Sequence, residues 1–182
     1  VSWSDNSDNE DGFILERGVG DPIVWGVIDT VSTDVTNYLD ESVLEGVSYS
    51  YRCKAFNSFT NTFTNYSNIS SVVTKIKSPS GLVSLADKVG EITLVWLDKS
   101  SAETGFNIER GVGNPISYSV VGTVASNIVT NVDNTVEEGV EYSYRISAFN
   151  SLITSDYSNV VKIRSKASFI NVPTDLRAEL HS

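Results

Sequence analysis

One sequence motif occurs twice in this chain, and the duplication constrains how its 182 residues can fold. When Trp3 is aligned with Trp96, the two halves stay in register without a gap as far as Ser58, and about half of the aligned positions are identical. A unit of roughly ninety residues can build one hydrophobic core without disulfides, so the duplication predicts two small domains. We place them at residues 1–78 and 79–166, followed by a tail of residues 167–182.

The charge of the chain limits the partners that it can have. It contains 23 acidic and 13 basic residues, which gives a net charge of −10. Such a surface repels nucleic-acid phosphates and anionic lipid headgroups, and no apolar run approaches the ~20 residues of a membrane-spanning helix. We therefore expect no nucleic-acid partner and no membrane insertion. One cysteine excludes an internal disulfide. The start at Val1 without methionine favours a mature or excised piece over a complete translation product.

Apolar and polar residues alternate in both copies, which is the pattern of half-buried β-strands. Ile92, Leu94 and Trp96 alternate in this way, and no stretch has the spacing of an amphipathic helix. The cleanest series is repeated between the copies, as Tyr142, Tyr144, Ile146 and Ala148 and as Tyr49, Tyr51, Cys53 and Ala55. The sequence thus predicts an all-β protein in which Cys53 acts as a small buried hydrophobe rather than a reactive thiol.

The order of motifs in each copy resembles a known family. In the second copy a strand tryptophan is followed by Gly-Phe-Asn-Ile-Glu-Arg, by Glu-Gly-Val-Glu-Tyr-Ser-Tyr-Arg and by Tyr-Ser-Asn, and the first copy keeps this order. The order resembles the fibronectin type III domain in its bacterial and phage-like form. The resemblance implies two tandem seven-stranded, immunoglobulin-like sandwiches. It also implies that Trp3 and Trp96 lie in the cores and that Tyr49 and Tyr142 are corner tyrosines bound to backbone just upstream.

The resemblance also implies that the first copy lacks a strand. In the second copy, strand A contains Pro79, Leu82 and Ser84 and precedes the tryptophan strand, whereas the first copy starts two residues before its tryptophan. The tail repeats the proline, leucine and small-residue spacing of strand A. We expect this orphan segment to complete the first domain of a neighbouring molecule, through Pro173, Leu176, Ala178 and Leu180.

A neighbour is the expected acceptor because the tail reaches its own first domain poorly. Residues 165–171 span at most ~25 Å when fully extended, which is short beside two sandwiches stacked end to end. The alternative is that the chain is a segment of a longer multi-repeat polypeptide, in which the same strand contact is made within one covalent chain.

The candidate motifs for catalysis and for cofactor binding lack the surrounding residues that such sites need. Gly18-Val19-Gly20 leads into another strand and not into a helix, so it is predicted to be a hairpin turn and not a nucleotide loop. Residues 5–11 are rich in acidic side chains, but Gly12 is misplaced for a calcium-binding loop. We therefore predict an exposed acidic loop and not a calcium site. His181 is the one histidine and lies in the tail, which leaves no catalytic triad in either domain. We expect no cofactor, no metal site and no enzyme activity.

The first copy carries a candidate ligand loop, residues 57–65, which is longer than its counterpart and contains Phe59 and Phe63. These aromatics either anchor a partner or cap the edge of the sandwich, and Asn65 and Asn68 begin formal glycosylation sequences.

The first function hypothesis is a structural spacer of an extracellular, cell-surface or virion-surface fibre, with further copies of the chain as its partners. The alternative is an adhesive or accessory module that recognises a surface protein or glycan through its loops.

Overall fold

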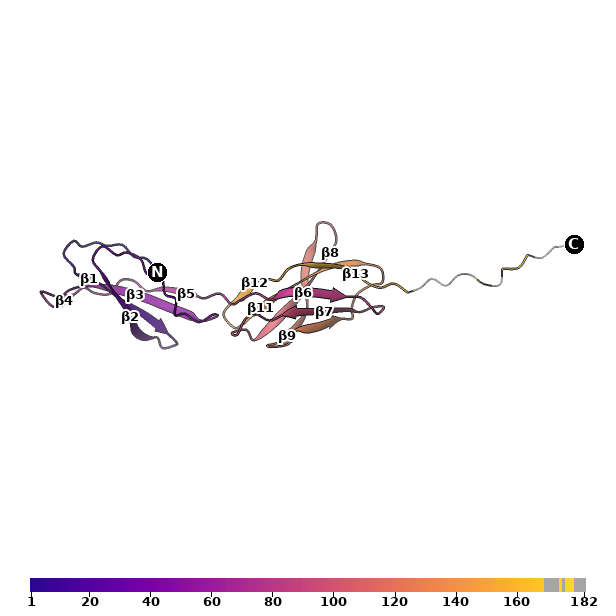
Figure 1. Cartoon of the computed structure of the whole chain (residues 1–182), viewed down its shortest axis with the longest axis horizontal. Helices are drawn as coiled ribbons and strands as arrows, with labels where there is room; N and C mark the ends of the chain where they lie inside the picture. Colours follow the sequence, from indigo (N-terminus) through magenta and orange to yellow (C-terminus); the bar gives the residue numbers. More distant parts are fainter. Residues whose placement is uncertain (169–173, 175, 179–182) are drawn as a thin grey trace.

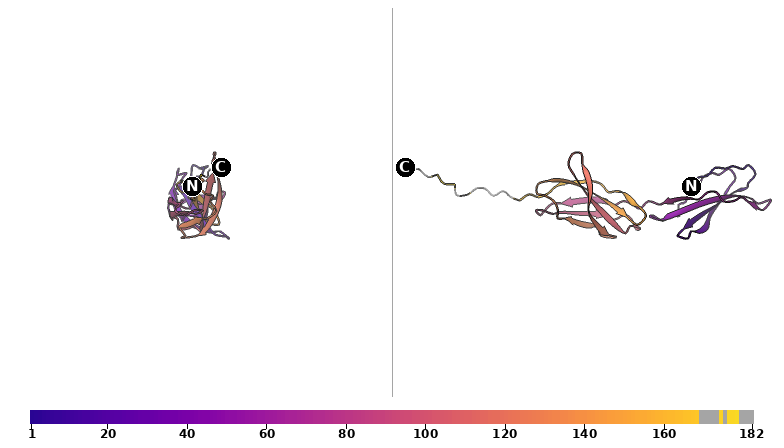
Figure 2. Two further views of the ribbon diagram at one scale, coloured as in Figure 1. Left: turned by 90° about the vertical axis from the view of Figure 1, so that its right-hand side faces the viewer. Right: turned by 180° about the vertical axis from the view of Figure 1, so that it is seen from behind.

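The computed structural model describes residues 1–168, 174 and 176–178, and every regular element in that part of the chain is a β-strand. Within these residues, no helix is present that could cross a membrane. The strands form two bodies that follow one another along the long axis of the molecule (Figure 1, Figure 2). The prediction of an all-β protein made of tandem immunoglobulin-like sandwiches is confirmed.

The second copy is a complete two-sheet sandwich. One sheet has the order β10-β7-β6, formed by β6 (Ser80–Leu85), β7 (Ile92–Leu97) and β10 (Thr130–Asp133). The other has the order β12-β11-β8-β9 and consists of β8 (Gly105–Val112), β9 (Ser117–Ala125), β11 (Glu141–Phe149) and β12 (Thr154–Tyr157), with β13 (Val161–Arg164) pairing with β11. All pairings between named strands are antiparallel, so short turns suffice to connect neighbours.

The core of the second copy lies between these sheets, because alternate residues of each strand point inward. On β7, Ile92, Leu94 and Trp96 are all buried, and Trp96 is only 1% exposed. Phe106 meets the Trp96 ring from the opposite sheet, with the ring centroids 5.7 Å apart in an edge-on arrangement. Leu82 of β6 closes the same cluster from the edge of the smaller sheet.

The first copy has one full sheet and only the beginning of a second. Its five-stranded sheet has the order β2-β1-β3-β4 and contains β1 (Gly12–Val19), β2 (Val24–Ser32), β3 (Ser48–Asn57) and β4 (Thr62–Phe63), with β5 (Ser70–Val73) pairing with β3. Across the core from it, the chain start pairs with a short segment through an isolated bridge between Ser2 and Asn37. Trp3 N donates to Thr36 O and Tyr38 N to Val1 O, both at 2.9 Å. Within the described residues, no strand of the first copy corresponds to β6.

The two sandwiches meet at a junction made of specific polar contacts. Glu45, in the turn before β3, accepts hydrogen bonds from the backbone and hydroxyl of Ser101 at 2.8 Å each, and one from Lys77 N at 3.0 Å. Asn150 Nδ2 donates across the junction to Gly46 O at 3.1 Å and within its own sandwich to Ala102 O at 3.2 Å. Because backbone groups from both copies are held, the junction restrains how the sandwiches are oriented.

The closeness of this junction gives a prediction at Gly46, which has φ +69°. A Cβ there would lie 2.5 Å from Asn150 Nδ2 and 2.7 Å from Ile76 Cγ2, and Ile76 belongs to the core of the second copy. We expect Gly46→Ala to lower the melting temperature of the second sandwich. The matched control is Gly139→Ala, because Gly139 has φ +70° but open space around it, with Ala167 at 3.9 Å. Gly139→Ala should lower the free energy of unfolding by only ~1 kcal/mol, the cost of a side chain at a positive φ. If calorimetry showed that both variants lower the melting temperature equally, the close junction would be contradicted.

Candidate functional site

The first copy contains a groove with a cavity volume of about 510 Å³. One wall is the chain start, residues 1–7, and the other is the segment from Thr64 to Ser70. Residues from Tyr51 to Ala55 on β3 form the floor, together with Phe13 of β1. The groove therefore opens directly onto side chains of the hydrophobic core.

In the second copy the corresponding space is occupied by β6. That strand pairs with β7 and also contacts β13, which places Leu82 in the core with almost no exposed surface. Ile146 on the floor is fully buried there, whereas Cys53 at the same repeat position is half-buried and lines the groove. Trp3 is likewise half-buried, in contrast to Trp96. The difference follows from strand content, because the aligned core residues are otherwise nearly the same.

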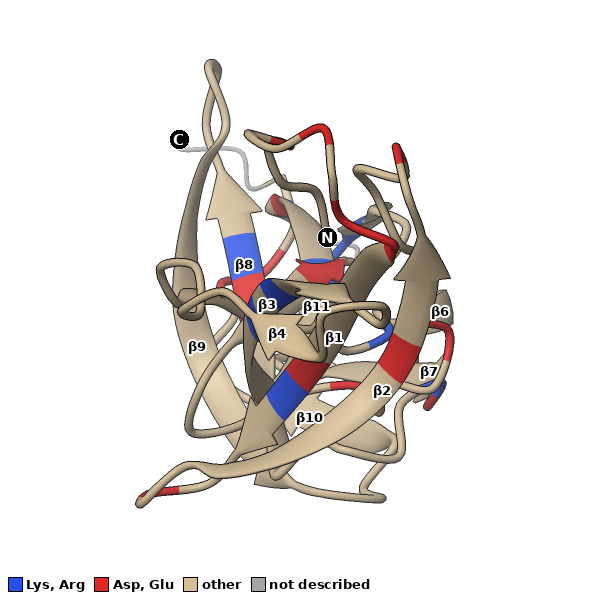
Figure 3. Cartoon of the chain, turned by 90° about the vertical axis from the view of Figure 1, so that its left-hand side faces the viewer, with Lys and Arg blue, Asp and Glu red and all other residues tan. Residues whose placement is uncertain are grey.

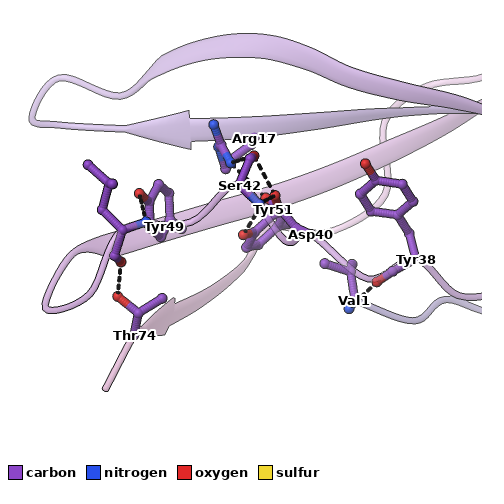
Figure 4. A network of polar contacts seen from close by, with 9 residues as sticks. Val1, Arg17, Tyr38, Asp40, Ser42, Tyr49, Tyr51 and Thr74 are labelled. Carbon is purple, nitrogen blue, oxygen red and sulfur yellow. Dashed lines mark hydrogen bonds and ion pairs between the residues drawn. The ribbon is translucent and has the colours of Figure 1, made fainter. Parts of the chain in front are cut away.

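A buried ion-pair network holds the full sheet of each copy against the opposite side of its sandwich. In the first copy Arg17 Nη1 donates to Asp40 Oδ2 at 2.8 Å, and Tyr51 Oη donates to the same oxygen at 3.0 Å (Figure 4). Ser42 donates to the other oxygen from its backbone N at 3.0 Å and from its hydroxyl at 2.7 Å. The side chain of Asp40 is 6% exposed, so the carboxylate itself is largely shielded from water.

These hydrogen bonds predict how the first sandwich responds to acid. Burial raises the pKa of Asp40, but the bonds from Ser42, Arg17 and Tyr51 outweigh it and lower the pKa to about 2. A folded-state pKa below the unfolded value stabilises the fold at neutral pH, and this stabilisation is lost as pH falls from about 4 to about 2. We expect the loss to be about 2 kcal/mol for this group in urea unfolding at successive pH values. Asp40→Asn should flatten the dependence over that range; an unchanged slope would contradict the assignment.

The outer face of each full sheet carries an arginine between two aromatic rings. Arg52 lies 4.2 Å from the centroid of Trp25 and 3.7 Å from that of Tyr66, and its Nη2 is 2.6 Å from a Glu16 oxygen. The second copy repeats the arrangement with Arg145, Tyr118, Tyr157 and Glu109. Since the cation, the rings and the carboxylate satisfy one another in both copies, the arrangement stabilises the outer face of the sheet.

The first copy extends this face with the predicted ligand loop. Phe63 lies on β4 with the Lys54 ammonium 4.7 Å from its ring centroid, so this ring has a partner within the chain. Phe59, in the turn before β4, is 96% exposed. The two aromatics therefore do not form one packed cluster, and Phe59 is the more accessible of the two.

The acidic residues that follow the chain start form a loop, seen in red near the N label in Figure 3. Asp5 Oδ1 accepts a hydrogen bond from Ser7 N at 3.0 Å, and Glu10 accepts one from the Thr33 hydroxyl at 2.9 Å. Among the residues that the structure describes, His, Cys, Asp and Glu form no group of three or more that could hold a metal ion.

The remaining residues singled out in the sequence fall into two groups. The corner tyrosines are buried, and each hydroxyl accepts a backbone N–H from upstream: Tyr49 from Leu44 at 3.0 Å and Tyr142 from Glu137 at 2.9 Å. In the tail, Leu176 is 100% exposed and Ala178 is also exposed. Pro173 and Leu180 lie outside the described residues.

Sequence reasoning missed the junction and the polar networks. Glu45-Gly46 and Glu138-Gly139 are identical pairs, and Asn57 and Asn150 also match. Identity of this kind, at positions outside the alternating core pattern, was the signal that could have marked these residues. The pattern alone did not say whether the repeated polar residues contact their own sandwich or the next one.

Two known proteins are similar in sequence to this chain. No family model matches the sequence. It is 24% identical over 174 residues, 94% of the chain, to amylopullulanase of Thermoanaerobacterium thermosulfurigenes, and 37% identical over 78 residues, 42% of the chain, to amylopullulanase of Thermoanaerobacterium saccharolyticum. The chain spans only 9% and 6% of the length of these two proteins.

Solved structures give the fold. A segment of two fibronectin type III domains from chicken tenascin is 14% identical, with a TM-score of 0.67 over 90% of each chain. The chicken interferon gamma receptor alpha chain is 18% identical, with a TM-score of 0.52 over 91% of this chain and 90% of that one. The resemblance found in the sequence is confirmed at the level of the fold: the two copies are tandem sandwiches of the fibronectin type III type.

Proposed function

We propose that the chain is a structural spacer in which sandwiches are joined end to end, and in which the open first sandwich is completed by a strand-A segment from a neighbouring molecule. The alternative is that an adjoining repeat of one longer chain supplies this segment. The observation that carries this proposal is the groove of about 510 Å³ at the position that β6 occupies in the second copy. An open groove lined by core side chains destabilises the folded first sandwich, because apolar surface stays in contact with water.

The chain itself carries a segment suited to the groove. Residues 173–178 repeat the proline and leucine spacing of Pro79 and Leu82, the latter being the residue that β6 buries. Leu176 is fully exposed and so has its apolar surface available for another molecule. Strand addition would supply backbone hydrogen bonds, and the leucine would supply apolar burial.

The junction supports a spacer role. Glu45 and Asn150 restrain the orientation of one sandwich on the next, which favours a spacer of defined length and direction. In the described residues the carboxylates with the most hydrogen bonds, Asp40 and Asp133, are engaged by their own arginines and hydroxyls. This engagement favours a structural role over catalysis. We place the spacer outside the cell, on a cell or virion surface.

Cys53 offers a direct test, because it is the one cysteine of the chain and lines the groove. We expect its reaction with a thiol reagent to slow as the protein concentration rises, since a neighbour's segment would cover it. The variant Leu176→Asp/Leu180→Asp of the 182-residue chain should react at one rate at all concentrations, because charged residues are costly to bury. If the parent chain also reacts at a concentration-independent rate equal to that of the variant, strand donation is wrong.

The second candidate is an accessory module that binds a glycan or a surface protein. Two observations favour it: Phe59 is almost fully exposed, and both curated relatives bear the name of a pullulan-degrading enzyme. Under this proposal Phe59→Ala would abolish retention on pullulan without changing the melting curve. Leu152→Ala is the matched control, because Leu152 is the aligned, exposed residue of the second copy. A parent chain that is not retained would exclude pullulan as the ligand.

A further inference from the structure

Besides its pairing with β7, strand β6 is held in the second copy by one side-chain amide. Asn159 Oδ1 accepts a hydrogen bond from Leu82 N at 2.9 Å, and Asn159 Nδ2 donates to Leu82 O, also at 2.9 Å. A single asparagine therefore satisfies both backbone groups of the residue whose side chain enters the core. Neither bond depends on the identity of the side chain that is held, because both are made to backbone.

The first copy has the same asparagine in the same local setting. Asn68 follows Ser67, whose N donates to Cys53 O at 2.8 Å and whose hydroxyl accepts from Cys53 N at 3.1 Å. In the second copy Ser158 makes the same two contacts with Ile146, at 2.8 and 3.0 Å. The serine hydroxyls also donate to the carbonyl of the following asparagine, at 2.8 Å in both copies. The backbone that carries Asn68 is thus positioned like the backbone that carries Asn159.

Within the described residues, the side chain of Asn68 contacts no β-strand, whereas that of Asn159 holds β6. Asn68 is exposed, it lines the groove, and its recorded contact is from Nδ2 to Ile69 O at 3.5 Å, beyond the usual 2.7–3.2 Å of an N–H···O bond. A donor and an acceptor therefore face a groove whose equivalent contains a β-strand.

We propose that Asn68 is the backbone clamp for the incoming strand, and that it holds the N–H and C=O of Leu176 from a second copy of this chain. The inference rests on the proposed strand donation and adds the residue that sets its register. Leu176 occupies the place of Leu82 when Pro173 is aligned with Pro79. The amide recognises extended backbone at one position, while the groove beside it selects a leucine side chain there. The partner is thus an extended segment with leucine three residues after proline.

The test uses the 182-residue chain with Leu176→Asp as the acceptor, because this variant keeps the groove but donates its own tail poorly. The probe is a fluorescent peptide of residues 172–180, and its binding is measured by polarisation. Adding Asn68→Ala should weaken binding at least about tenfold, since two hydrogen bonds are lost. Asn68→Asp keeps an acceptor for the peptide N–H but loses the donor, so its affinity should be intermediate. Asn9→Ala is the matched control and should bind like the acceptor, because Asn9 is an exposed asparagine of the first copy that does not line the groove.

The outcomes separate the clamp from the donated strand. Because Asn68 is exposed, its alanine variant should melt like the acceptor, so weaker binding cannot be attributed to unfolding. If the acceptor binds the peptide and Asn68→Ala binds it equally well, the clamp is wrong and strand donation stands. If the acceptor does not bind the peptide at all, both proposals fall.

Discussion

Replacing Trp96 by alanine should destabilise the second sandwich by about 3–5 kcal/mol, the cost of truncating a fully buried aromatic residue. Trp96 is 1% exposed and packs edge-on against Phe106 between the two sheets. A loss of this size is a large part of the stability of a small domain. It should appear in calorimetry as a transition of the second sandwich shifted to much lower temperature or lost.

The repeat supplies its own control for this substitution. Trp3 stands at the aligned position and packs on Phe13 at 5.5 Å, but it is only half-buried because the groove is open beside it. We expect Trp3→Ala to cost about half as much, since transfer free energy follows the area removed from water. Equal losses in the two sandwiches would show that the first core is closed in solution.

Replacing Asp133 by alanine should destabilise the second sandwich by about 3–5 kcal/mol, the range for removing one partner of a buried ion pair. The carboxylate accepts from Arg110 Nη1 at 2.9 Å and from the Tyr144 hydroxyl at 2.8 Å, and it also accepts from the backbone N and hydroxyl of Thr135. Its side chain is 3% exposed, so the groups left behind cannot turn to bulk water.

A surface ion pair in the same sandwich is the control for Asp133→Ala. Glu91 lies 3.3 Å from Lys88 on the exterior, and we expect Glu91→Ala to leave the melting curve almost unchanged, as exposed pairs contribute little. Urea unfolding of both variants gives the comparison. If Asp133→Ala were as mild as Glu91→Ala, the network would be a solvated contact and not part of the core.

The sequence predicted those parts of the fold that depend on alternation and repetition. The series through Ile92, Leu94 and Trp96 is the inner face of β7, and the proline and leucine of strand A bracket the start of β6. These features could be predicted because strand geometry imposes a period of two and because the second copy provides a template for the first.

The contacts that depend on three-dimensional register could not be predicted in this way. Glu45 meets Ser101 only because two sandwiches stack, and Asn159 meets Leu82 only because strands far apart in the sequence lie side by side. Neither contact follows a local period. The asparagine in Tyr-Ser-Asn was visible as a repeated motif, but its role as a clamp emerged only from the bonds made by its counterpart.

The mass of the chain in solution tests the central claim, which is that a strand-A segment from a neighbour completes the first sandwich. Sedimentation equilibrium should give a mass that rises above 19.8 kDa with protein concentration for the parent chain. The variant Leu176→Asp/Leu180→Asp of the same 182 residues should stay at about 19.8 kDa over the same range. A parent chain that remains at the mass of one molecule at every concentration, or a variant that assembles equally well, would contradict the account.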